Sequence, residues 1–168
     1  MTAQAPNYGA FDRVEWPVRT ARLSVRPATE ADAETAWAWR SLPEVTHWLT
    51  AAGSHDDFVR RWSEPDRLAV TLLVEHEGRG VGDLVIRVTD AWAQAEVAHT
   101  ARGAQAELGW ALHPGVQGRG FATEAVAETG MGVVADKVTK NRACSRGIVD
   151  YYRGEDYVSP RIDEARKI

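Results

Sequence analysis

The sequence contains a single cysteine, Cys144. One cysteine excludes an intramolecular disulfide framework and any metal site built from several thiolates, and we expect Cys144 to be a buried or incidental thiol. The sequence also lacks an apolar run near the ~18 residues that a membrane-spanning helix needs. Residues 1–13 contain no basic stretch followed by an apolar core, as a secretion signal would. We therefore expect a soluble, cytoplasmic protein.

Concentrated positive charge is absent too. The net charge is −4 and no long basic run occurs, whereas proteins that bind nucleic acid usually carry a basic patch or stripe. The five histidines show no H-x-x-x-H spacing, which a helical metal site would favour. We expect neither a nucleic-acid partner nor a metal site.

The length of 168 residues suits one domain with a proper core and is too short for two ordinary domains. Residues 1–19 mix proline, glycine, asparagine and charged residues, which is typical of a leader that is mobile or draped over the fold. The single domain is expected to span residues 20–168.

Hydrophobic periodicity predicts the order of elements. Alternation predicts strands at 21–26, 68–76, 81–88 and 105–112, the middle two forming a hairpin with a turn of three to five residues. Thr29 is the expected N-cap of a helix over 30–42 that Pro43 ends, and short helices follow over 43–49 and from Asp56. Residues 90–103 form a long hairpin connection or a frayed strand extension. Runs of antiparallel strands with helices at particular places favour an α+β fold.

Four tryptophans lie in the helical part of this pattern. An aromatic residue at helical spacing is usually part of the core, and we expect core or groove packing for Trp37, Trp39, Trp48 and Trp62.

Residues 105–123 carry the strongest functional pattern. Ala106, Leu108, Trp110 and Leu112 alternate with Glu107, Gly109 and Ala111, as in a half-buried strand. A glycine loop, QGRG, follows and leads into a helix. The unpaired N–H groups at a helix N-terminus bind anions, and glycine lets a ligand approach them. The segment therefore predicts a phosphate or pyrophosphate site.

The helix after this loop contains Gly130 and Gly132. Each glycine costs about 1 kcal/mol relative to alanine inside a helix. We therefore expect the helix to be short or kinked there.

Two motifs resemble one family. Gln117-x-x-Gly120-x-Ala122 resembles the Q/R-x-x-G-x-G/A signature of the Gcn5-related N-acetyltransferases, and AELGWAL at 106–112 is similar to the strand that precedes it there. RLSVRP at 22–27 looks like the start of the branch that acetylates ribosomal-protein N-termini. The resemblance covers roughly residues 20–127. It implies an acyl-CoA N-acyltransferase fold, with a mixed, mostly antiparallel sheet flanked by helices.

The resemblance also implies roles for individual residues. Glu107, ten residues before Gln117, is the candidate catalytic base; the alternative is a solvent-facing residue that only positions its neighbours. The backbone of the strand end would bond the pantetheine arm of acetyl-CoA, and the loop would hold its pyrophosphate. The implied cofactor-binding residues are Trp110, Ala111, Leu112, Gln117, Gly118, Arg119, Gly120, Phe121, Ala122 and Thr123.

The last 40 or so residues depart from the family. VTKN at 138–141 is a possible fifth strand, Asn141 and Ser145 are a wrongly spaced version of an Asn-x-x-Ser motif, and Tyr151, Tyr152 and Tyr157 match no general acid. A truncated or rearranged C-terminal third would produce such a sequence. It would remove one wall of the cofactor cleft.

The resulting hypothesis is an N-acetyltransferase that transfers an acetyl group from acetyl-CoA to a primary amine, either a protein N-terminus or a small molecule. A catalytically impaired acetyl-CoA-binding module is the first alternative, and a generic phosphate-binding α+β domain is the second. The sequence names no acceptor, and it leaves a homodimer open.

Overall fold

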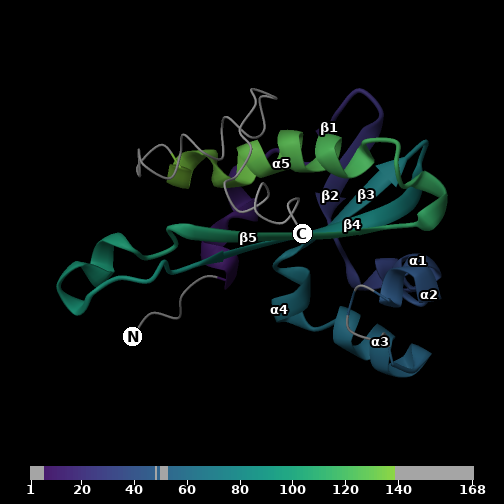
Figure 1. Ribbon diagram of the computed structural model, residues 1–168, viewed down its shortest axis with the longest axis horizontal. Coiled ribbons are helices and arrows are strands. Elements are labelled where there is room, and N and C mark those ends of the chain that lie inside the picture. The colour runs from purple at the N-terminus through teal and green to yellow at the C-terminus, as the bar shows by residue number, and fades with distance from the viewer. Residues whose placement is uncertain (1–5, 48, 50–52, 139–168) are drawn as a thin grey trace, which may run out of the picture.

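The alternating segments form a five-stranded antiparallel sheet in the order β1-β2-β3-β4-β5. In the computed structural model, residues 6–47, 49 and 53–138 are described. Helix α5 covers one face of the sheet, and α1 to α4 cover the other (Figure 1). The expected α+β class with an antiparallel sheet flanked by helices is confirmed, and the sheet is antiparallel throughout the described strands. The strands are β1 Val18–Arg19, β2 Leu23–Pro27, β3 Thr71–His76, β4 Arg79–Thr89 and β5 Gln105–Leu112, and the α-helices are α1 Ala33–Arg40, α2 Pro43–Thr46, α3 His55–Trp62, α4 Pro65–Leu68 and α5 Phe121–Val138.

Several expectations fall outside the described residues. These are the fifth-strand remnant, the rearranged C-terminal third, and the residues Trp48, Cys144, Asn141, Ser145, Tyr151, Tyr152 and Tyr157.

The core has one layer on each side of the sheet. On the α5 side, alternate residues of the strands, such as Val25, Leu72 and Ile86, are fully buried against the helix. On the other side, Trp39 and Trp62 are almost fully buried, as their helical spacing predicted. No described helix has both the length and the apolar character needed to cross a membrane.

A buried ion pair joins α1 to the sheet. Asp83 of β4 has an exposed fraction of 0%. Its carboxylate accepts hydrogen bonds from Trp39 Nε1 at 2.9 Å and from Arg40 Nε at 2.8 Å, and it also binds the Nη2 group of Arg40. On the next strand, Ala111 of β5 lies directly opposite Asp83.

Two hairpin details differ from the sequence expectation. The β3–β4 turn has two residues, because His76 pairs with Arg79, and Glu77 and Gly78 both have positive φ, at 50° and 74°. A two-residue hairpin turn favours this conformation, whereas a turn of three to five residues was expected. The strand before the turn also starts later than expected, since Pro65 begins the short helix α4, a position that proline favours.

Helix α5 is longer than expected. It continues through Gly130 and Gly132 to Val138, so the expectation of a short helix was wrong. Val133, beyond both glycines, is 2% exposed and belongs to the core. Packing of the helix on the sheet therefore offsets the low helix propensity of glycine.

The segment before β2 lies against the sheet from residue 6 onward. Asn7 bonds the backbone of β4 beyond the end of β3: its Nδ2 donates to the carbonyl oxygen of Ile86 at 3.0 Å, and its Oδ1 accepts from the Val88 N–H at 2.7 Å. Ala10 is 3% exposed within the core. These contacts hold Asn7 and Ala10 against the sheet, and both the leader over residues 1–19 and the domain boundary at residue 20 stay predictions.

The β4–β5 hairpin ends in a projecting arm, residues 90–104, which extends to the left in Figure 1. The arm contains the 3-10 helix η4, Ala95–Thr100. Asp90 bonds both the Tyr8 hydroxyl and the Gly103 N–H. The base of the arm is therefore attached to the N-terminal segment.

Substituting Asn7 by alanine should destabilise the protein. The change leaves a donor and an acceptor of β4 without their partner, which costs about 1–3 kcal/mol in the free energy of unfolding. Urea denaturation of Asn7→Ala beside Glu15→Ala, an exposed change in the same segment, tests this. Equal midpoints for the two variants would show that Asn7 does not hold the segment.

Acidification should remove a contribution that Asp32 makes. Burial acts to raise the pKa of Asp32, but hydrogen bonds from Arg26 and Thr29 outweigh it, so the pKa lies below its ordinary value. A lowered pKa stabilises the fold above the unfolded pKa of about 3.9, and this contribution disappears as the pH falls through the folded pKa. Asp32→Asn should be less stable at pH 7 by about 1–3 kcal/mol, and its stability should depend less on pH below about pH 4. Denaturation curves from pH 7 to pH 2 measure both effects.

Candidate functional site

Strand β5 forms the outer edge of the described sheet. Ala106, Leu108 and Leu112 pack on the α5 side and Ala111 packs on the other, so the predicted alternation is confirmed for these four. Trp110 belongs to the first row by spacing, yet 51% of it is exposed. A large apolar side chain is therefore presented to solvent at the end of β5.

The glycine loop after β5 needs its glycines for their backbone conformation. Gly118 and Gly120 have φ of 72° and 76°, in the left-handed region that side chains disfavour. The Gln117 side chain ties the loop to the strand, since its Nε2 donates to the carbonyl oxygen of Leu112 at 2.9 Å. The Gly120 carbonyl accepts from the N–H of Glu124 at 3.0 Å and so begins α5.

A side-chain clamp attaches the start of α5 to the β1–β2 turn. Glu124 accepts from Arg22 Nε at 2.7 Å, from the Arg22 backbone N–H at 2.9 Å and from the Thr20 hydroxyl. Arg22 Nη1 also donates to the carbonyl oxygen of Arg119 at 2.8 Å. Burial acts to raise the pKa of Glu124, but the bonds from Thr20 and Arg22 lower it on balance. The clamp therefore holds an ionised carboxylate, and through Arg22 it also fixes the backbone of the glycine loop at Arg119.

Phe121 anchors the loop in the core. Its side chain is 1% exposed, and its ring lies 4.7 Å from the guanidinium carbons of both Arg22 and Arg119. The ring of His76 lies 4.7 Å away. Two guanidinium groups therefore flank the N-terminus of α5, where unpaired N–H groups already favour an anion.

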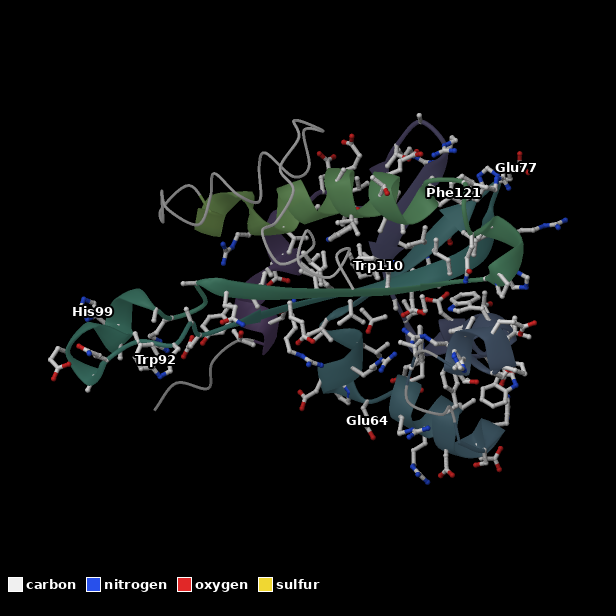
Figure 2. All side chains as sticks on the ribbon, viewed as in Figure 1. Glu64, Glu77, Trp92, His99, Trp110 and Phe121 are labelled. Atoms are coloured by element: carbon white, nitrogen blue, oxygen red, sulfur yellow. The ribbon has the colours of Figure 1, made fainter. Side chains whose placement is uncertain are left out.

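These elements enclose a pocket of about 500 Å³, a size typical of small-molecule sites. The end of β5, the glycine loop, the first turn of α5 and the region of α2 contribute to its walls, and Figure 2 labels Trp110 and Phe121 among them. Nine of the ten residues predicted to bind the cofactor line it. The lining residues are Glu44, Val45, Leu49, Trp110, Ala111, Leu112, Val116, Gln117, Gly118, Gly120, Phe121, Ala122 and Thr123.

Two predicted site residues do not line the pocket. Arg119 lies beside it, stacked on Phe121. Glu107 lies three residues before Trp110 on β5, and 67% of its side chain is exposed, with Oε2 at 3.4 Å from Arg87 Nη1. The described residues thus bring the predicted cofactor-binding set together and leave Glu107 outside it.

The sequence did not single out two parts of the site. Glu44, Val45 and Leu49 form a wall opposite the loop, and only the general expectation that the early helices shape a pocket pointed there. The Arg22–Glu124 clamp had one signal, an acidic residue in the first turn of a helix. Within the described ranges, no group of three or more His, Cys, Asp or Glu side chains could hold a metal ion.

Comparisons with known proteins agree with this geometry. A protein-family model described as "Acetyltransferase (GNAT) domain" matches residues 22–145. Among solved structures, an acetyltransferase of the GNAT family from Bacillus anthracis is 18% identical, with a TM-score of 0.56 over 80% of this chain and 81% of that one. The aminoglycoside acetyltransferase AAC(6')-Ib in complex with coenzyme A is 18% identical, with a TM-score of 0.54 over 68% of each chain.

A third solved structure is RimJ from Mycobacterium smegmatis in complex with CoA-disulfide. It is 18% identical, with a TM-score of 0.47 over 76% of this chain and 67% of that one, which is too distant to assign a branch. A search of the curated proteins finds no match.

The Bacillus anthracis and AAC(6')-Ib structures share the fold, and the family model covers well over half of the chain. The chain therefore belongs to the GNAT acetyltransferase family.

Proposed function

We propose that the pocket binds acetyl-CoA and that the protein transfers the acetyl group to a primary amine. One observation carries the proposal: the strand end and the glycine loop, which were predicted to bind different parts of one cofactor, line the same pocket of about 500 Å³. AAC(6')-Ib, which shares the fold, has been solved with acetyl-CoA.

The pyrophosphate of the cofactor fits the start of α5. The first N–H groups of a helix have no partner within the helix, and the positive φ of Gly118 and Gly120 opens the loop around them. Arg119 would add positive charge beside the phosphates, since its guanidinium is held over Phe121. The N–H groups at the start of α5 and the Arg119 guanidinium are therefore the groups proposed to bind the phosphates.

The pantetheine arm fits the outer edge of β5. Trp110, Ala111 and Leu112 line the pocket, and β4 occupies only one side of the strand. An extended arm can pair with the other side as an added strand. The exposed Trp110 and the nearby Leu49, 39% exposed, would then be covered by ligand.

The transfer requires a neutral amine. Its nitrogen attacks the thioester carbonyl carbon, a C–N bond forms, the C–S bond breaks, and the thiolate leaves and is protonated. A backbone N–H near the end of β5 would polarise the carbonyl. We assign Glu107 the removal of the amine proton, directly or through water.

The acceptor class follows from a weaker signal. The segment at 22–27, RLSVRP, is similar to the start of the ribosomal-protein N-terminal branch. A protein N-terminus is therefore our first candidate, and a small-molecule amine is the second.

One observation favours an alternative function. Glu107 is exposed and lies outside the pocket, as expected for a catalytically impaired module that binds acetyl-CoA without transferring its acetyl group. Turnover with any acceptor in a panel of peptides, polyamines and aminoglycosides excludes this alternative.

Gly120→Glu should weaken cofactor binding. It places a carboxylate in the pocket at a residue with φ of 76°, and the repulsion should weaken coenzyme A affinity at least about tenfold, or 1.4 kcal/mol. Gly78→Glu is the matched control, since Gly78 has φ of 74° in the β3–β4 turn and suffers the same backbone strain but does not line the pocket. Isothermal titration calorimetry with coenzyme A compares the two. Equal affinities would refute the placement of the pyrophosphate.

Glu107→Gln should impair transfer without affecting cofactor affinity. A general base contributes about 10²–10⁴-fold to the rate, so kcat should fall by at least about 100-fold. Glu96→Gln, an exposed change on the projecting arm, serves as control. A loss of kcat below about tenfold would reduce Glu107 to a partner of Arg87.

A further inference from the structure

The face of the sheet covered by α1 to α4 carries a group of arginines that the proposed chemistry does not use. Arg87 of β4 lies opposite Glu107 of β5, and Asp83, which binds Arg40, lies opposite Ala111. The group, here the arginine cluster, consists of Arg40, Arg67 and Arg87, with Asp83 among them.

Strand register relates the backbone of Arg67, through Thr71, to open space on β5. Its backbone carbonyl accepts from the Thr71 hydroxyl at 2.7 Å. Thr71 lies opposite Val85, which lies opposite Gly109, so Gly109 is about 10 Å from Thr71 at ordinary strand spacing. An added Cβ at Gly109 would meet no described atom within 4 Å.

This open space adjoins the proposed acetyl-transfer site. Gly109 and Glu107 lie two and four residues before Ala111, which lines the pocket, and residues two apart share a strand face. At about 3.3 Å per residue, Gly109 lies about 7 Å from Ala111. An amine that approaches the end of β5 along this face of the strand therefore passes Gly109, next to Glu107 and its partner Arg87.

The three arginines differ in how their charge is balanced. Arg40 is bound by the buried Asp83, and Arg87 lies 3.4 Å from Glu107. Arg67 makes no ion pair with a described residue; its guanidinium carbon lies 5.7 Å from the Trp62 ring, and its Nε is buried without a hydrogen-bond partner among the described residues. A buried, unpaired donor costs about 1–3 kcal/mol, and more when charged.

The surroundings of Arg67 are net positive. Burial lowers the pKa of Arg67, Arg40 lowers it further, Asp83 acts in the opposite direction, and Arg87 and Arg61 again lower it. A guanidinium in such surroundings would gain from a carboxylate, which it binds in a planar, two-pronged geometry.

We propose that Arg67 is a specificity-determining residue that binds the carboxylate of an acidic acceptor. This inference rests on the proposed function and narrows its acceptor to an amine that carries a carboxylate nearby. An acidic amino acid and a peptide with an acidic first residue both present that chemistry. In this arrangement the carboxylate of the acceptor forms an ion pair with Arg67, and the amine of the acceptor faces Glu107.

The test compares acceptors that differ only in charge. One pair is free glutamate and glutamine, and the other is two peptide amides of identical sequence that begin with Glu or Gln. The release of coenzyme A measures kcat/KM for each. The wild-type protein should prefer the acidic member about tenfold to hundredfold, the worth of one hydrogen bond to a charged group, and the pair that shows the preference identifies the source of the carboxylate.

Variants then assign the preference to Arg67. Arg67→Met keeps the apolar stem over Trp62 and removes the charge, so the preference should fall to near one through KM, with the rate on glutamine acceptors unchanged. Arg67→Lys keeps the positive charge but loses the planar guanidinium, so this variant should retain part of the preference for the acidic acceptor. Arg79→Met, an exposed change in the β3–β4 hairpin, should change nothing.

The outcomes are separable. Equal or better use of glutamine acceptors by the wild-type protein, or a preference that survives in Arg67→Met, overturns the inference and leaves acetyl transfer intact. If circular dichroism shows that Arg67→Met does not fold, a full preference in Arg67→Lys overturns it. If coenzyme A binds but no acceptor is acetylated, the proposed transfer fails. Calorimetry of the Glu peptide with coenzyme A-saturated protein then decides, and equal affinity in wild type and Arg67→Lys overturns the role of Arg67.

Discussion

The arrangement of the site depends on the interaction of the buried Asp83 carboxylate with helix α1. It accepts hydrogen bonds from Trp39 and Arg40 of α1, and it lies opposite Ala111 on the strand that lines the pocket. Loss of one partner from a buried ion pair typically costs 3–5 kcal/mol, so α1 is held over β4. Helix α2 follows α1 after two residues, and it provides the wall that faces the glycine loop. One ion pair thus holds α1, and through it α2, over the sheet beside the pocket, and it also neutralises Arg40.

Much of the fold could be predicted because it depends on local patterns. Alternation located β2, β4 and β5, and Thr29 with an acidic first turn located the start of the first helix. The errors arose where tertiary contacts outweigh local preference. Gly130 and Gly132 stay helical because α5 packs on the sheet, and the positive φ of Glu77 is tolerated because both strands of the hairpin are paired. Local propensity contains no information about either effect.

The candidate site likewise has a part that local sequence predicts and a part that it does not. Residues 110–123 are nearly continuous in the chain, so a strand, a loop and a helix start could be predicted to meet one ligand. The Glu44 wall and the unpaired Arg67 come from segments distant in sequence, and their positions depend on strand register. Glu107 shows the limit of motif spacing: its distance from Gln117 along the chain fits a catalytic base, but the chain folds with its side chain toward solvent and Arg87.

The clamp between Arg22 and Glu124 has a consequence for the order of folding. It joins residues 102 apart in the chain, and the bond from Arg22 to the Arg119 carbonyl spans 97. Closing loops of this length is entropically costly, and contacts of such separation form late in folding. A growing chain that ends before α5 has the complete glycine loop but cannot hold its shape. Phosphate binding by the glycine loop should therefore appear only when α5 docks on the sheet. It would then indicate that the described sheet has assembled.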